Sequence, residues 1–284
     1  MIVTVGEVVW DCFPDRQVLG GAPVNVAYHL DRLGVKAVPV TRVGQDDLGR
    51  RTRAFLARAG VDCAGIQEDP ELPTGRVEVR FDARGEPCFE IMGPAAWDAI
   101  AWEPAAALVA GQAYALVFGT LAQRDKRSRS TIERLAAGAG TCYYDVNLRP
   151  PHTPVERVAV SLEWAQVVKM NEEELALLGQ ELGLAAPTGQ ETAERLRRRF
   201  GVQTLLVTQG EQGAWLVDDD GLLAVAGLPV AVADPVGAGD AFLAAYIAAA
   251  EAGADRQERL RRANRHGALV ASLPGGMPEL PPEA

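Results

Sequence analysis

The sequence predicts an α/β fold, a three-layer α/β/α sandwich in which a mainly parallel central sheet lies between two layers of helices. Short runs rich in β-branched residues alternate with amphipathic helical stretches along most of the chain, which is the pattern of parallel strands joined by crossover helices. Two regions interrupt this alternation with hairpin patterns. We therefore expect antiparallel additions, including a small second sheet beside the main one.

Six short apolar runs are the predicted strands of the central sheet, over residues 2–5, 37–43, 115–118, 141–146, 167–170 and 204–208. Helices are predicted between them, for example over 24–33 and 48–59, because apolar residues recur there at helical spacing. Gly34 and Gly60 follow these two stretches directly. A glycine in this position supplies the left-handed residue that commonly ends a helix.

Residues 74–91 are predicted to form a hairpin, two strands of alternating polarity around the turn Asp82-Ala83-Arg84-Gly85. One face of this hairpin is apolar and requires a cover, which the extended stretch 10–15 could supply. We expect segments at about 10–20 and 74–97 to form the small sheet as a lid over the main one. A second hairpin is predicted over 214–225. Since the sequence contains no internal repeat or flexible linker, residues 1–284 are expected to form a single domain.

The composition excludes several classes of protein. The 284 residues are 48% hydrophobic and 23% charged, which argues against a disordered, coiled-coil or fibrous chain. A net charge of −10 disfavours a nucleic-acid partner, because phosphate binding requires clustered Lys and Arg. The longest apolar run, 241–250, is about half the length of a membrane span. The cysteines and histidines are scattered, so neither disulfides nor zinc are expected, and a first strand rather than a signal peptide begins the sequence. These features predict a cytoplasmic protein.

The segment 234–240, DPVGAGD, directly precedes the predicted helix 241–252. Its small residues allow the backbone to approach a ligand, and the first turn of a helix directs unpaired N–H groups and a positive dipole end at an anion. A carboxylate at Asp240 would repel that anion unless it acts on the ligand. A base that takes a proton from an attacking hydroxyl, beside a transferring phosphoryl group, fits this position. The alternative is that Asp240 only caps the helix or interacts favourably with the helix dipole.

The segment 20–27, GGAPVNVA, predicts a site for a small polar ligand. The paired glycines Gly20 and Gly21 allow close approach of the backbone, and Asn25 offers a donor and an acceptor to the hydroxyls of a sugar. The alternative is a tight turn in which Asn25 satisfies the local backbone. Neither the G-x-x-x-x-G-K-[ST] nor the G-x-G-x-x-G signature occurs in the chain, so the common nucleotide motifs are absent.

In their order and separation, these two segments resemble the N- and C-terminal signatures of the ribokinase-like (PfkB) carbohydrate kinases. The intermediate motifs 145–149 (DVNLR), 171–174 (NEEE) and 208–213 (TQGEQG) also follow in the order of that family. The resemblance spans nearly the whole chain and implies a ribokinase-like fold. The segments 6–11 (GEVVWD), 96–98 (AWD) and 119–121 (GTL) look most like those of bacterial fructokinases.

The resemblance implies a role for each matching residue. Asp240 is the implied catalytic base, and the backbone amides of Gly237, Ala238 and Gly239 form the implied anion hole. The implied sugar-binding residues are Asp11, Gly20, Gly21 and Asn25. The implied nucleotide-binding residues are Arg149, Asn171, Thr208, Gly210, Gly213 and Asn264. Glu174 and Asn171 would hold Mg²⁺ through water.

Several assignments have alternatives at this stage. Asn171 and Glu174 also form the pattern of a capping box. Arg149 either reaches the nucleotide phosphates or pairs with Asp145. Asp11 could be a surface residue of an extended stretch. Pro235 stands where the family often has threonine, which removes a hydroxyl and an N–H from a loop that a monovalent cation could use.

The resemblance therefore implies an ATP-dependent kinase that transfers the γ-phosphoryl group in line to a primary hydroxyl of a small sugar, with fructose as the first candidate. The lid would exclude water, and its exposed edge implies a homodimer. Alternatives are a nucleoside acceptor, 2-keto-3-deoxygluconate held by the hairpin residues Arg76 and Arg80, or a non-catalytic sugar-binding protein. An oxidoreductase is disfavoured because the dinucleotide motif is missing.

Overall fold

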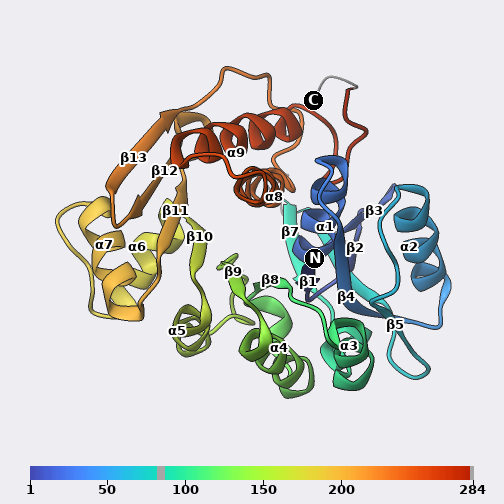
Figure 1. Cartoon of the computed structure of the whole chain (residues 1–284). Helices are drawn as coiled ribbons and strands as arrows, with labels where there is room; N and C mark the ends of the chain where they lie inside the picture. Colours follow the sequence, from blue (N-terminus) through green and yellow to red (C-terminus); the bar gives the residue numbers. More distant parts are fainter. Residues whose placement is uncertain (82–86, 282–284) are drawn as a thin grey trace.

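A nine-stranded sheet forms the centre of the computed structural model, which describes residues 1–81 and 87–281 (Figure 1). Its strand order is β13-β12-β11-β10-β9-β8-β1-β4-β5; the β11–β12 and β12–β13 pairs are antiparallel, and all other pairs are parallel. The bounds are β1 Ile2–Val5, β4 Ala37–Gly44, β5 Ile66–Asp69, β8 Ala115–Gly119, β9 Thr141–Asp145, β10 Val167–Asn171, β11 Thr204–Thr208, β12 Gly213–Asp218 and β13 Gly221–Ala226. The predicted mainly parallel sheet is confirmed.

Helices cover both faces of this sheet. Figure 1 shows α1, α8 and α9 on one face and α3 to α7 on the other. The first face carries α1 Ala22–Arg32, α2 Asp47–Arg58, α8 Ala238–Glu251 and α9 Arg256–Ala271. The second carries α3 Trp102–Val109, α4 Lys126–Gly138, α5 Val155–Trp164, α6 Glu172–Glu181 and α7 Gly189–Phe200. The three-layer α/β/α sandwich predicted from the sequence is therefore present.

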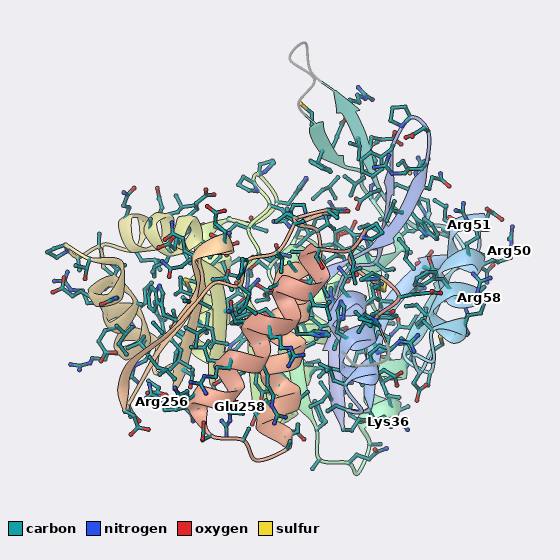
Figure 2. All side chains as sticks on the ribbon, turned by 90° about the horizontal axis from the view of Figure 1, so that it is seen from above. Lys36, Arg50, Arg51, Arg58, Arg256 and Glu258 are labelled. Carbon is teal, nitrogen blue, oxygen red and sulfur yellow. The ribbon has the colours of Figure 1, made fainter. Side chains whose placement is uncertain are left out.

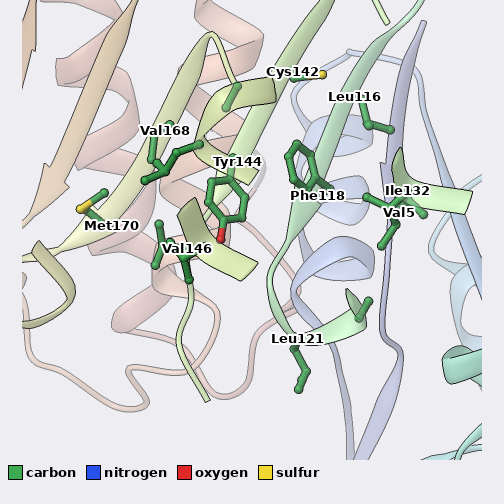
Figure 3. Packing of buried hydrophobic residues seen from close by; sticks show 14 of the residues in the cluster. Val5, Leu116, Phe118, Leu121, Ile132, Cys142, Tyr144, Val146, Val168 and Met170 are labelled. Atoms are coloured by element: carbon green, nitrogen blue, oxygen red, sulfur yellow. The ribbon is translucent and has the colours of Figure 1, made fainter. Parts of the chain in front are cut away.

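Each parallel strand sends side chains into two hydrophobic cores, one on each side of the sheet. Along β8, Leu116 and Phe118 enter the core under α3 to α7, whereas Val117 enters the core under α1 and α8. Figure 3 shows Phe118 beside Tyr144 of β9, and their stacked ring centroids lie 4.9 Å apart. Burial on both faces explains why these strands are almost continuously apolar in the sequence.

The small sheet has the order β3-β2-β6-β7, with bounds β2 Val9–Cys12, β3 Gln17–Gly20, β6 Gly75–Phe81 and β7 Pro87–Ile91. The predicted pairing of the stretch after β1 with the hairpin is present, because β2 runs parallel to β6. Figure 2 shows β6 and β7 projecting from the body of the molecule. The predicted turn Asp82-Ala83-Arg84-Gly85 lies outside the described residues.

Two elements differ from the sequence prediction. The edge strand β5 was not predicted, because its sequence IQED carries one apolar residue and no alternation. Helix α8 begins at Ala238 rather than at residue 241, since Gly237 adopts a left-handed conformation with φ of 78° and the helix starts immediately after it. Gly239 and Asp240 therefore belong to the first helical turn. Among the described residues, no helix combines the length and apolar character that crossing a bilayer requires.

Candidate active site

A cavity of about 710 Å³ lies between the small sheet, the loop after β9 and the N-terminus of α8. It is next to the carboxyl ends of the parallel strands, where ligands bind in open α/β sheets. The sequence-predicted site residues that line it are Asp11, Gly20, Gly21, Asn25, Arg149, Gly237, Gly239 and Asp240. The structure thus brings together the predicted sugar-binding segment and most of the predicted anion-binding segment.

Asp240 is a buried carboxylate in the first turn of α8, 9% exposed. Its Oδ2 accepts a hydrogen bond from Asn25 Nδ2 at 2.7 Å. The helix has no side-chain cap hydrogen bond at this end, so the interpretation of Asp240 as a cap is wrong. Burial raises the pKa of Asp240 to about 6, although nearby Lys169 and the Asn25 hydrogen bond oppose the rise. A pKa near neutrality suits a general base.

The turn before α8 is braced by the C-terminal loop. A Cβ on Gly237 would lie 2.4 Å from Gly276 Cα, so both the left-handed backbone and this close approach require glycine. Asp234 Oδ2 accepts from the Gly275 amide at 3.1 Å. The Ala238 amide donates to Pro235 O at 3.3 Å, whereas within the described residues no hydrogen bond is made by the Gly239 amide. Gly239 therefore offers a free donor at the helix N-terminus.

The sugar-binding candidates Asn25 and Asp11 line the same cavity. Asn25 is buried, and its Oδ1 has no hydrogen-bond partner among the described residues. Its amide binds Asp240 and not the local backbone, so the alternative interpretation as a simple turn residue is wrong. Asp11, on β2, lines the cavity, and burial raises its pKa to about 6. Hydroxyl donors of a polyol would satisfy these buried acceptors.

Glu7, two residues after the end of β1, was not predicted as a site residue, although it lines the cavity and is only 4% exposed. Its Oε2 lacks a hydrogen-bond partner within the described part of the chain, and burial raises its pKa. A charged residue following a strand of apolar residues was the available signal. Glu7 also raises the pKa of Asp240 by charge repulsion.

Lys169 was missed as well. Its Nζ donates to both carboxylate oxygens of Asp145 at 3.1 Å. The two residues lie opposite each other on the paired strands β10 and β9. The signal was a lysine inside the apolar run of β10, since lysine is rarely buried without a partner. The alternative that Arg149 pairs with Asp145 is therefore wrong; the Arg149 guanidinium donates to Leu148 O and lines the cavity.

Asn171 and Glu174 form the predicted capping box at the start of α6. Asn171 Oδ1 accepts from the Glu174 amide at 2.8 Å, and Glu174 Oε2 accepts from the Asn171 amide at 2.9 Å. Glu174 Oε1 accepts from the Leu148 amide at 2.7 Å, which ties α6 to the loop that carries Arg149. Neither Asn171 nor Glu174 lines the 710 Å³ cavity.

These residues fit Mg²⁺ only as an ion that keeps its water. The described residues contain no cluster of three or more His, Cys, Asp or Glu side chains that could enclose a metal. Each Glu174 carboxylate oxygen accepts one backbone hydrogen bond and retains further acceptor capacity. Metal-bound water could use that capacity, as is usual for Mg²⁺.

The remaining nucleotide-binding candidates lie outside the cavity. Thr208 pairs in register with Asn171 at the ends of β11 and β10. Gly210 and Gly213 have φ of 56° and 106° in the turn that follows. Asn264, on α9, donates through Nδ2 to Ala226 O at 2.9 Å. The structure thus places these residues beside β10, β11 and β13 and does not bring them into contact with Asp240.

Comparisons with known proteins agree with this arrangement. A family model described as pfkB family carbohydrate kinase matches residues 3–282. Fructokinase of Vibrio alginolyticus is 31% identical over 295 residues, covering 97% of this chain and 94% of that protein. Fructokinase of Salmonella typhimurium is 30% identical over 98% of this chain and 95% of its own length.

Solved structures with the same fold carry sugar-kinase ligands. Fructokinase of Vibrio cholerae O395, with fructose, ADP and calcium ion bound, superimposes with a TM-score of 0.84 at 26% identity, covering 98% of this chain and 95% of that one. Aminoimidazole riboside kinase of Salmonella enterica, complexed with aminoimidazole riboside and an ATP analog, gives a TM-score of 0.83 at 25% identity, covering 99% and 97%.

Proposed function

Because the chain belongs to the pfkB family of carbohydrate kinases, we propose that this ATP-dependent sugar kinase phosphorylates a primary hydroxyl of fructose, with Asp240 as general base. One observation carries the proposal: Asp240, Gly239 with its free amide donor, and Asn25 with its unpaired acceptor line one cavity. A base, an anion cradle and a polyol site are the parts that this transfer requires.

In the proposed reaction Asp240 accepts the proton of the attacking hydroxyl. Asn25 donates to Oδ2 of the Asp240 carboxylate, which leaves the Oδ1 of Asp240 for the hydroxyl of the acceptor sugar. The amides of Gly237, Ala238 and Gly239 would stabilise the charge on the transferring phosphoryl group, with the α8 dipole adding to their effect. Catalysis is then mainly positioning and charge stabilisation, with little covalent chemistry for the protein.

A neutral sugar fits the site better than a keto acid. The acceptor-rich wall formed by Asp11 and Asn25 suits hydroxyl donors, and the backbone of Gly20 and Gly21 completes this side. Arg76 and Arg80, the hairpin cations considered for a carboxylate substrate, do not line the cavity; they lie 4.0 Å and 3.9 Å from Glu78 and Glu90 respectively. Fructose is the first choice because relatives spanning the whole chain are fructokinases.

ATP would lie along the edge from the cavity towards β13. The proposed nucleotide contacts are Arg149, Asn171, Thr208, Gly210, Gly213 and Asn264. Mg²⁺ would be held through water by Glu174 and Asn171, and when bound it neutralises charge on the phosphates. A monovalent cation near the 234–237 turn is a further proposal, and a potassium titration of the activity tests it.

We also propose that residues 1–284 act as one cytoplasmic domain whose small sheet, about 10–20 and 74–97, is a lid and the surface of a homodimer. The open edges of the small sheet at β3 and β7 support the dimer, as does Phe89, which is 56% exposed on β7. A monomer mass that does not change with concentration in light scattering would reject it.

The test is a coupled assay of ADP release with fructose, glucose, ribose, 2-keto-3-deoxygluconate and aminoimidazole riboside. Fructose should give the highest kcat/KM, and Asp240→Asn should lower kcat by about 10²- to 10⁴-fold while calorimetry still detects sugar and nucleotide binding. A better acceptor than fructose would reassign the substrate. Near-normal turnover in Asp240→Asn would reject the mechanism.

A further inference from the structure

Lys169 is a buried ammonium beside the first turn of α8. The other lysines of the chain, Lys36 and Lys126, are exposed, whereas Lys169 is 8% exposed and lines the cavity. Burying a charge of this kind is costly unless it has a partner or a function. The pairing with Asp145 supplies the partner.

The ammonium also explains why residue 239 is glycine. Gly239 does not have a positive φ, so its backbone does not demand glycine. A Cβ at this position would lie 2.7 Å from Lys169 Nζ and 3.4 Å from Cε. The lysine side chain therefore occupies the space that a larger residue 239 would need, and its charge lies next to the free Gly239 amide.

One donor of this ammonium is still available. A lysine ammonium has three N–H donors. Lys169 uses two of them on Asp145, at 3.1 Å each, and within the described residues it makes no other hydrogen bond. Because Lys169 borders both the cavity and Gly239, the remaining N–H is available to an anion at the start of α8.

The charge balance of the cavity needs this cation. Glu7, Asp11, Glu90 and Asp240 are the carboxyl residues of the cavity wall, and the Lys and Arg residues there are Lys169 and Arg149. Arg149 is exposed, and its guanidinium donates to the carbonyl of its neighbour Leu148. Lys169 is the cation fixed by burial and by an ion pair, which is the preorganisation that charge stabilisation requires.

We propose that Lys169 is a catalytic residue, whose ammonium, held by Asp145, donates to a non-bridging oxygen of the γ-phosphoryl group beside the Gly239 amide. The inference rests on the proposed kinase function. During transfer the acceptor oxygen bonds to the γ-phosphorus, the bond from that phosphorus to ADP breaks, and the acceptor proton passes to Asp240. Lys169 keeps its proton and offsets the negative charge.

The test compares two nucleotides at equilibrium. The Kd of ADP and of the unreactive β,γ-imido analogue of ATP are measured with the wild type, Lys169→Met and the exposed control Lys36→Met. Lys169→Met should weaken the analogue by about tenfold more than ADP, because only the analogue has a γ-phosphoryl group. It should also lower kcat at least about 10²-fold, with the KM for fructose changed less than about threefold. Lys36→Met should change none of these.

Equal weakening of both nucleotides, or no change in their ratio, would overturn the inference, since a purely structural lysine affects both alike. Lys169→Met leaves Asp145 buried without its partner and could fail to fold. The double variant Lys169→Met/Asp145→Asn removes both charges. It must show the same loss of preference for the β,γ-imido analogue of ATP over ADP. Wild-type protein without sugar-dependent ADP release would instead reject the kinase reaction itself, which separates the two failures.

Discussion

Acidification is the sharpest test of Asp240 as the base, because the base must be ionised to accept a proton. Burial raises the pKa of Asp240 from its ordinary value of 3.8 to about 6. Activity measured as kcat/KM for fructose should therefore fall as the pH drops through this region, since kcat/KM reports the free enzyme.

The size of the fall follows from the pKa. A group with a pKa of about 6 is about 90% ionised at pH 7 and about 10% ionised at pH 5, so kcat/KM should fall about ninefold to tenfold between these values. An ordinary aspartate would still be about 94% ionised at pH 5 and would cause almost no loss. The two cases differ enough to be separated by initial rates.

Variants can assign the fall in kcat/KM at low pH, the acid limb of the pH profile, to Asp240. Asp11 has a pKa near the same value, so the profile is repeated in Asp11→Asn, where the limb should persist. Asn25→Ala removes the hydrogen bond that favours the ionised carboxylate, and it should move the limb to higher pH. Tyr28→Phe is the matched control, because Tyr28 lies on the same helix and binds Pro278 O, not Asp240.

Ionisation of the nucleotide contributes equally to all these proteins, so a shift that depends on the variant belongs to the enzyme. A limb that stays in place in Asn25→Ala, or that disappears in Asp11→Asn, would show that another group controls the rate. Either result refutes the assignment of the perturbed pKa to the catalytic base.

Further predictions concern stability and metal. Because burial raises the folded-state pKa of Asp240 above its unfolded value, ionising this carboxyl destabilises the fold as the pH rises from about 4 to about 6. Asp240→Asn should therefore raise Tm relative to the wild type at pH 8 and change it much less at pH 4. Gly237→Ala should lower Tm and activity together, because its Cβ would collide with Gly276. Tyr28→Phe should cost about 1 kcal/mol in denaturant unfolding, through loss of its 2.6 Å bond to Pro278. Chelation by EDTA should abolish turnover, and added Mg²⁺ should restore it.

The sequence predicted the parallel sheet and its covering helices because buried parallel strands are mostly apolar and because Gly34 and Gly60 mark the ends of two helical stretches. It did not predict β5, whose polar side chains at the sheet edge leave no periodicity. The start of α8 was misplaced because the left-handed conformation of Gly237, not a capping side chain, begins that helix. Local patterns therefore predicted the layers but not every boundary.

The candidate site was also predicted only in part from the sequence. Gly20, Gly21 and Asp240 were identified because glycine-rich turns before helices are visible in a linear sequence. The pairing of Lys169 with Asp145 depends on the register of β10 against β9, which no local pattern encodes. A lysine inside an apolar run was the available signal for Lys169, but its partner Asp145 could be identified only from the tertiary structure.

The hydrogen bond from Asn25 to Asp240 joins residues that are 215 positions apart in the chain. Asn25 lines the cavity of the proposed sugar site and has a buried, unpaired Oδ1, while its Nδ2 donates to the proposed base. A sugar hydroxyl that donates to Oδ1 would fix the Asn25 amide and, through it, the Asp240 carboxylate. Sugar binding and base orientation are therefore coupled by one side chain, so Asn25→Ala should reduce kcat as well as raise the KM for fructose. A variant in which only KM changes would show that Asn25 contributes binding alone.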